Sequence, residues 1–195
     1  MGMAHAYATL DGVKGFSKER ALKCFNENIK SAKESGKAVD LAQDMNYKCL
    51  YYALFDPGSR AEKRAFQNAL SKIRDLEEID QAAYKNNHVY YDLYRCFSFY
   101  RQLLRDKAVP LDYKDCQKLS CIKENSWRKA LMAKYLGALH AASGETGEAR
   151  KLFDEAIKTL NNEKSVSTIL GFIKATVYAE AYRSLGDSIY LEEGR

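Results

Sequence analysis

Apolar side chains recur along most of this chain at intervals of three and four residues, which is the spacing of one face of an α-helix. A clear example is the set Ala65, Phe66, Ala69, Leu70, Ile73 and Leu76. Only 2 prolines occur, and β-branched residues rarely cluster, so little interrupts long helices. The pattern predicts an all-α protein.

Capping and breaking residues divide this pattern into separate helices. Ser17 is a favourable N-cap for the first helix, and Gly36 is a favourable end. The run Asp56-Pro57-Gly58 predicts a turn, and the next helix begins near Ser59. The predicted helices cover residues 17–35, 37–54, about 59–76, 80–107, 113–123, a pair within 127–160 joined at 144–147, and 165–185.

The helix pair near the C-terminus carries a more specific pattern. The pair Leu136-Gly137 is followed, twelve residues after the glycine, by Ala149 and then by Phe153 and Ala156. This spacing resembles the tetratricopeptide repeat. The resemblance implies antiparallel helix pairs stacked as a divergent helical repeat, with a groove that binds a peptide or a helix of a partner. The long middle helices do not keep the repeat period of about 34 residues, so an irregular helical bundle is the alternative architecture.

The same resemblance implies groove residues on the first helix of the repeat. Lys134 and Ala138 lie on the face that such a repeat turns toward its ligand. Lys134 would then meet an acidic or carboxylate-ended ligand. A lysine in contact with solvent alone is the alternative interpretation.

The predicted helix 80–107 is the most aromatic part of the chain. One of its two stripes contains Tyr90, Tyr94 and Phe97 and continues to Arg101. The functional interpretation is a groove wall that holds a peptide or a nucleic acid. The structural interpretation is an ordinary interhelical core with tyrosine hydroxyls at its edge.

Composition and charge narrow the function. The chain has 195 residues, 46% of them hydrophobic and 29% charged, which is consistent with a single all-helical domain over residues 1–195. The formal net charge is +5, and acidic residues are interspersed with the basic ones. The nearest approach to a phosphate-binding cluster is Arg95, Arg101, Arg105 and Lys107, so a small basic regulator that binds nucleic acid is the alternative function.

Neither a metal site nor a catalytic motif emerges from the sequence. The cysteines are odd in number, and none of His5, His88 and His140 completes a zinc site with Cys116 and Cys121. No glycine-rich phosphate loop or nucleophile motif is visible. We therefore expect no cofactor, no metal and no enzyme activity. The sequence predicts a protein-protein interaction module that acts as an adaptor, chaperone or regulator.

Two further expectations concern location and assembly. No apolar run approaches the roughly 20 residues that cross a bilayer, and Met1 to Ala6 matches neither a secretion nor a myristoylation signal, so we expect no membrane contact and a cytoplasmic protein. The final helix carries more apolar side chains than one neighbour covers, which predicts self-association to a homo-oligomer. These side chains are Ile169, Phe172, Ile173, Val177, Tyr178 and Leu185.

Overall fold

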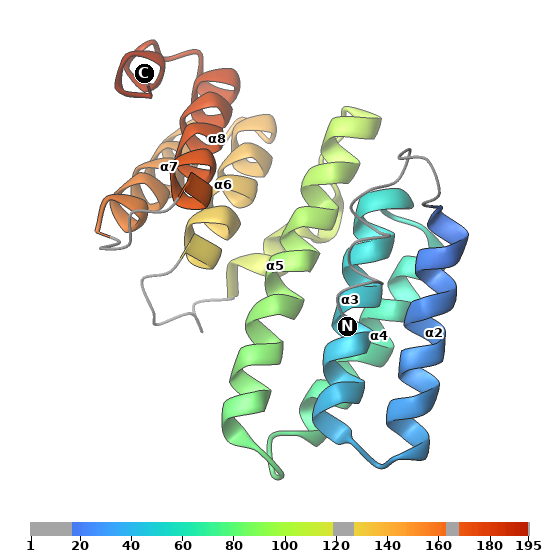
Figure 1. Ribbon diagram of the computed structural model, residues 1–195. Coiled ribbons are helices and arrows are strands. Elements are labelled where there is room, and N and C mark those ends of the chain that lie inside the picture. Colours follow the sequence, from blue (N-terminus) through green and yellow to red (C-terminus); the bar gives the residue numbers. More distant parts are fainter. Residues whose placement is uncertain (1–16, 119–126, 163–167, 195) are drawn as a thin grey trace. The chain divides into compact units, whose positions relative to one another are not determined.

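The structure, a computed structural model, describes residues 17–118, 127–162 and 168–194 (Figure 1). Every regular element within these ranges is a helix, which confirms the predicted all-α class. The elements are α2 (Lys18–Glu34), α3 (Ala38–Phe55), α4 (Arg60–Asp75), α5 (Gln81–Asp106), the 3₁₀ helix η1 (Leu111–Lys118), α6 (Trp127–Ala142), α7 (Thr146–Asn161), α8 (Thr168–Leu185) and α9 (Ile189–Glu193).

The chain divides into two compact units, residues 1–98 (unit 1) and residues 99–195 (unit 2). The boundary falls inside α5, which supplies its residues 81–98 to unit 1 and its residues 99–106 to unit 2. Each unit has a hydrophobic cluster of its own. The single domain expected over residues 1–195 stays a prediction.

The helix boundaries of unit 1 follow the capping residues that the sequence contains. The Ser17 and Ser59 hydroxyls accept hydrogen bonds, at 3.2 and 3.0 Å, from the backbone N–H three residues further on. Gly36 and Gly58 have φ angles of +67° and +82°, in the left-handed region that favours glycine. As a result α2 and α3 begin and end within one residue of their predicted bounds.

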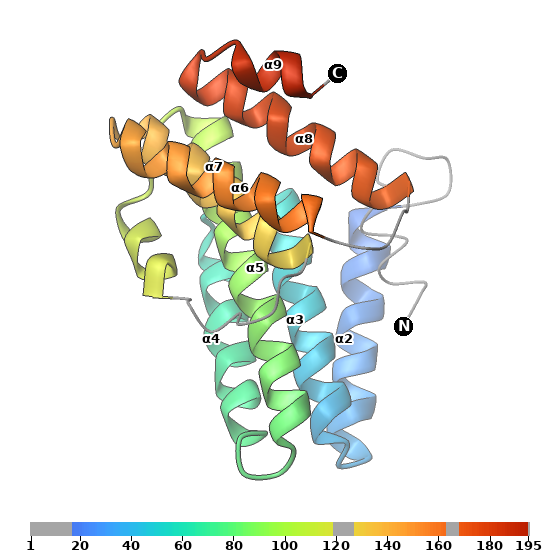
Figure 2. The ribbon, with the colours of Figure 1, turned by 90° about the vertical axis from the view of Figure 1, so that its left-hand side faces the viewer.

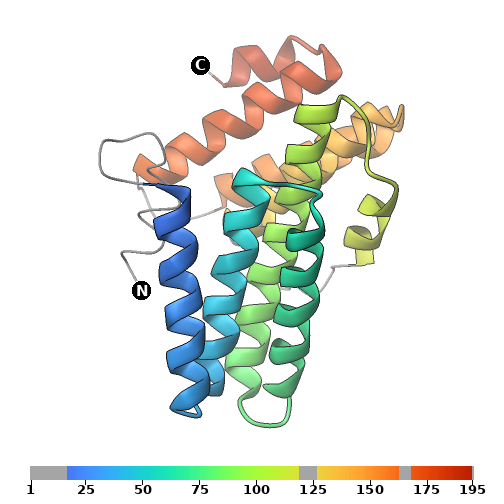
Figure 3. The ribbon, with the colours of Figure 1, turned by 90° about the vertical axis from the view of Figure 1, so that its right-hand side faces the viewer.

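Short turns make consecutive helices of unit 1 antiparallel, and α2, α3, α4 and the first part of α5 lie side by side (Figures 1 and 3). Aromatic rings join neighbouring helices edge to face. The ring centroids of Phe25 on α2 and Tyr51 on α3 are 6.2 Å apart, and those of Phe66 on α4 and Tyr91 on α5 are 5.4 Å apart. Such pairs stabilise a core beyond the area that they bury.

Two buried polar contacts also cross the interior of unit 1. The Glu62 carboxylate accepts a hydrogen bond from the Gly58 backbone N–H at 2.6 Å and another from the Ser98 hydroxyl at 2.5 Å. The Asn46 amide donates to the backbone carbonyl and the side-chain oxygen of Asn87, at 2.9 and 3.1 Å. Because an unpaired buried polar group is costly, these bonds favour one register of α3 and α4 against α5.

In unit 2, α6 and α7 form an antiparallel pair joined by a turn in which Gly144 has a φ of +83°. The two helices approach closely, since a methyl group on Gly137 would meet Cζ of Phe153 at 3.0 Å. Ala149 and Ala156 are fully buried on α7. These are the small-residue contacts that the sequence suggests, while the tetratricopeptide assignment itself stays a prediction.

The last two helices complete the core of unit 2. α8 packs against both α6 and α7, and α9 folds back onto α8 (Figure 2). Ile173, Val177 and Tyr178 of α8 are buried in this core. The Tyr190 hydroxyl on α9 donates to Oδ1 of Asp154 on α7 at 2.8 Å. Burial and this bond raise the pKa of Tyr190 to about 12.

The segment after Pro110 differs from its predicted form. The sequence suggests an α-helix over residues 113–123, whereas the structure contains a 3₁₀ helix over Leu111–Lys118. The Tyr113 backbone N–H donates to the Pro110 carbonyl at 3.3 Å, which is the tighter i to i+3 pattern. Residues 119–123 lie outside the described part.

The cysteines within the described part form no disulfide. Cys49 and Cys96 in unit 1 and Cys116 in unit 2 are buried, whereas Cys24 is half-buried. Burial raises the pKa of the Cys49 thiol well above its ordinary value. Cys121 lies outside the described residues.

Candidate binding groove in unit 2

The predicted aromatic site residues of α5 lie in unit 1. The Tyr90 and Tyr94 ring centroids are 5.9 Å apart. Tyr94 is buried and Tyr90 is half-buried. Arg101 is exposed and belongs to unit 2. The three residues therefore fall in different compact units.

The other two predicted site residues lie together on α6. Lys134 and Ala138 are both buried. The Lys134 ammonium lies 3.4 Å from the Thr176 hydroxyl of α8 and 4.7 Å from the ring centroid of Tyr135. Burial lowers the pKa of Lys134, although the negative charge of Glu180 acts in the opposite direction. Lys134 thus faces α8, and solvent reaches little of it.

A buried carboxylate organises the region beside Lys134. Glu180 of α8 accepts hydrogen bonds from the Tyr100 hydroxyl at 2.7 Å and from the Ser184 hydroxyl at 3.0 Å. Arg183 forms an ion pair with the same carboxylate. The burial of Tyr100, together with its bond to Glu180, raises the pKa of the tyrosine. This network, the Glu180 network, fixes residues 99–106 of α5 against α8 within unit 2.

A groove of about 250 Å³ lies next to the Glu180 network. Its lining consists of Leu103, Leu104, Lys107, Ala138, Ala141, Ala142, Arg183 and Ser184. Five of these side chains are apolar, and the three alanines are too small to fill the space. The two cationic side chains are Lys107 and Arg183. This groove is the candidate binding site, and it includes Ala138 from the sequence prediction.

The end of α5 determines where Lys107 lies. Its φ of +54° is left-handed, and its backbone N–H donates to the Leu103 carbonyl at 3.0 Å, so the helix stops there. Lys107 is exposed, and its ammonium group has no ion-pair partner among the described residues. Arg183 is different because Glu180 compensates its charge. Lys107 is therefore the cation of the groove that is available to a ligand.

A wider and shallower depression of about 590 Å³ lies on α2 in unit 1. Leu22 and Tyr51 are the apolar residues of its lining, and the others are Glu19, Lys23, Asn26, Glu27 and Lys30. Lys23 and Glu27 within the lining form an ion pair at 3.8 Å. A surface of this kind is well solvated, so we favour the groove in unit 2 as a binding site.

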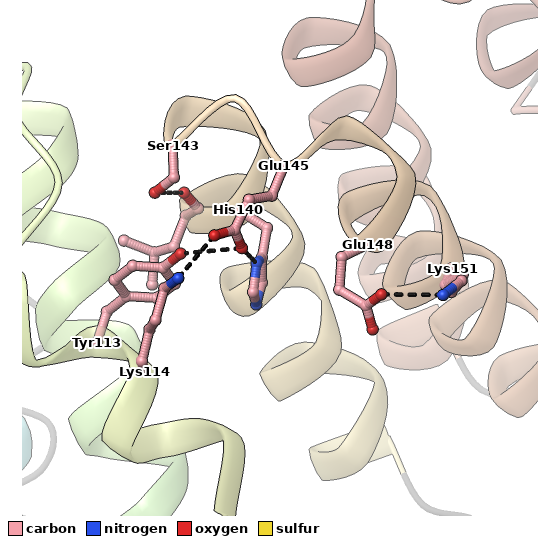
Figure 4. A network of polar contacts seen from close by, with 8 residues as sticks. Tyr113, Lys114, His140, Ser143, Glu145, Glu148 and Lys151 are labelled. Atoms are coloured by element: carbon pink, nitrogen blue, oxygen red, sulfur yellow. Dashed lines mark hydrogen bonds and ion pairs between the residues drawn. The ribbon is translucent and has the colours of Figure 1, made fainter.

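A second polar cluster surrounds the turn between α6 and α7 (Figure 4). Nδ1 of buried His140 lies 2.5 Å from Oε2 of Glu145, and the Lys114 ammonium lies 2.6 Å from Oε1 of the same carboxylate. The Tyr113 ring meets the His140 ring edge to face, with centroids 5.3 Å apart. Ser143 donates its hydroxyl proton to the Leu139 carbonyl. The cluster holds η1 against the turn, and its histidine is inaccessible to a substrate.

Unit 1 contains a histidine-carboxylate pair that the sequence interpretation missed. Nδ1 of His88 lies 3.0 Å from Oδ2 of the buried Asp92, and this bond raises the pKa of His88. The rings of Tyr84 and Tyr91 flank the imidazole, with centroids 5.6 and 6.1 Å away. The four-residue spacing of His88 and Asp92 on one helix is the signal that would have revealed the pair.

The described residues contain no group of three or more His, Cys, Asp or Glu side chains placed to bind a metal ion. None of the described helices combines the length and the apolar composition of a membrane span. Comparisons with protein-family models, with curated proteins and with solved structures find no match to this chain. The helices of the described residues therefore establish the fold class of this protein, which is all-α.

Proposed function

We propose that this protein is a non-catalytic protein-interaction module, an adaptor, chaperone or regulator, whose groove in unit 2 binds an apolar segment of a partner protein. The observation that carries the proposal is the groove itself, with five apolar side chains in its lining and the cation of Lys107 beside them. Burial of apolar area supplies affinity, and a cation beside that area selects a segment with an acidic residue.

The Glu180 network supports this proposal. Its hydrogen bonds to Tyr100 and Ser184 hold two walls of the groove in place without a ligand. A site that is already formed loses less conformational entropy on binding. The three alanines on α6 leave the floor open, so a larger apolar side chain from a partner would fit there.

Nucleic-acid binding is the second function that the sequence allows, through Arg95, Arg101 and Arg105. Arg105 pairs with Asp106, with Nε 2.6 Å from Oδ1, which reduces the charge that it offers to a phosphate. We therefore place protein binding first. We also propose a cytoplasmic location, because buried free thiols suit a reducing compartment.

The proposal is tested by selecting peptides from a phage-displayed library on the full chain and measuring their affinity by fluorescence anisotropy. Ala142→Trp fills the groove from an exposed position and should weaken binding by at least about tenfold. Lys107→Glu should weaken binding of peptides that contain an acidic residue and should spare neutral ones.

The matched controls are Ala61→Trp and Lys158→Glu, which make the same changes at exposed positions of α4 and α7. They should leave the affinity unchanged. Peptides that bind Ala142→Trp as tightly as the unaltered chain would place the binding surface elsewhere and refute the proposed site. Binding of a single-stranded oligonucleotide that weakens steeply with salt would favour the nucleic-acid alternative.

A further inference from the structure

One face of α8 is exposed and carries almost no charge. The exposed residues on this helix are Gly171, Phe172, Ala175, Ala179, Tyr182 and Arg183. Successive members of this set are one, three or four residues apart, so all six lie within one continuous arc of the helix surface. Phe172 is 71% exposed, and a Cβ added to Gly171 would meet nothing within 4 Å. Only Arg183 is charged. We call these six residues the α8 face.

The neighbouring α7 shows what a helix face in contact with water looks like in this unit. Its exposed residues include Glu148, Arg150, Lys151, Asp154, Glu155 and Lys158. The two helices pack against each other, yet only α7 has the charged exterior that is typical of a solvated face. The α8 face has instead the composition of a surface that another apolar surface covers.

The α8 face differs from the surface expected from sequence. Of that expected set, Ile173, Val177 and Tyr178 are buried inside unit 2, and Leu185 is half-buried. Phe172 is the member that is exposed. The side chain of Ile169 lies outside the described part.

Four of the six residues on the α8 face are placed symmetrically about the position of Val177 in the sequence. Phe172 and Tyr182 stand five residues on either side of this position, and Ala175 and Ala179 stand two residues on either side. When two identical helices cross antiparallel about a twofold axis at that level, each residue faces its mirror position in the other copy. The two aromatic and the two alanine positions of the α8 face are therefore complementary to the same positions in a second copy.

We propose that the α8 face is a homodimer interface in which two copies of α8 pack antiparallel, with the twofold axis at the level of residue 177 along the helix. Ala175 of one copy then faces Ala179 of the other, which lets the helices approach closely. Phe172 of one copy faces Tyr182 of the other, so an aromatic pair closes each end. Arg183 faces Gly171 at the edge, so the pairing opposes no like charges and buries no unpaired charge.

Sedimentation equilibrium of the full chain across the micromolar range tests the proposal. We expect the mass to rise from 22.2 kDa toward twice that value as the concentration increases. Ala179→Glu places a carboxylate at the centre of the interface and should weaken dimerisation by at least about tenfold. Ala61→Glu, the same change at an exposed position of α4, should have no effect.

A charge pair tests the register. Ala175→Lys and Ala179→Glu chains should each dimerise poorly alone and should form a heterodimer when mixed, because the lysine then faces the glutamate. A mixture of Ala61→Lys and Ala179→Glu chains is the control. The Ala61→Lys chain should dimerise with itself, because its α8 face is unaltered, and should form little heterodimer with the Ala179→Glu chain. Heterodimer formation in the first mixture alone supports the antiparallel register.

Three outcomes would overturn the proposal. The first is a mass of 22.2 kDa at every concentration. The second is a dimer that Ala179→Glu does not weaken, since the interface would then lie elsewhere. The third is a chain that stays monomeric and unfolds at a lower temperature when it carries Ala179→Glu. This result would mean that another part of the same chain covers the α8 face. Lys107→Glu should leave dimerisation unchanged, so the dimer proposal and the groove proposal can fail independently of each other.

Discussion

The ring of Phe153 lies against the backbone of Gly137, so a methyl group at residue 137 would come within 3.0 Å of Cζ of the ring. This contact sets how closely α6 and α7 approach. We predict that Gly137→Ala lowers the free energy of unfolding by about 1–3 kcal/mol, because the ring must move out of a packed site. Urea unfolding, followed by circular dichroism, measures the change.

The matched control for this prediction is Gly147→Ala on α7. A methyl group there meets nothing within 4 Å, and alanine is the better helix former. Stability should stay the same or rise slightly. Equal losses for the two variants would show that the contact with Phe153 does not limit the approach of the helices.

The buried carboxylate of Glu62 leads to a second prediction. Glu62→Ala leaves the Gly58 N–H and the Ser98 hydroxyl without their acceptor, so we expect a loss of about 2–4 kcal/mol in stability. Chemical unfolding provides the measurement. Glu78→Ala, at an exposed position, should change stability by less than about 0.5 kcal/mol. A small effect at Glu62 would mean that water replaces the carboxylate.

The His88–Asp92 pair predicts a pH dependence of stability. The pKa of His88 is raised in the folded protein, so the stabilisation is fully present below the unfolded histidine pKa of about 6.5. It is lost as the pH rises through the higher folded value. Thermal unfolding between about pH 6 and pH 8 should therefore show stability falling with pH, and His88→Gln should flatten this profile. Arg74 opposes the shift, so a buffer of moderate ionic strength, which screens the charge of Arg74, is the condition to use first.

Lys134 leads to a prediction in which the substitution of a buried polar residue does not reduce stability. Its lowered pKa means that the charged ammonium is disfavoured in the folded state. Glu180 keeps its partners Arg183, Tyr100 and Ser184 without it. We expect Lys134→Met to leave stability unchanged or to raise it by up to about 1 kcal/mol at neutral pH. A clear loss, measured by urea unfolding, would show that Glu180 depends on the lysine.

Local signals in the sequence were sufficient for much of the fold. The caps Ser17 and Ser59 and the glycine Gly36 act on their immediate neighbours, so the boundaries of α2 and the start of α4 follow from short stretches of chain. The type of helix after Pro110 was harder to predict from local signals, because a 3₁₀ helix and an α-helix differ by one residue in their hydrogen-bond spacing.

The candidate site depended on contacts that sequence spacing does not report. Lys107 and Arg183 stand far apart in the chain, and the fold places both at one groove. Lys134 lies on the helix face that the repeat pattern selects, but α8 covers that face. A helical pattern identifies an apolar or polar face, and only the tertiary arrangement decides which helix packs on it.

The buried thiols offer a way to measure how each unit opens. Cys49 and Cys96 report on unit 1, and Cys116 reports on unit 2, because an alkylating reagent reaches each sulfur only when its surroundings open. Half-buried Cys24 supplies a fast reference within the same chain. Mass spectrometry of the labelled peptides, each resolved by its own sequence, would then give a separate opening rate for each half of the molecule without any engineered probe.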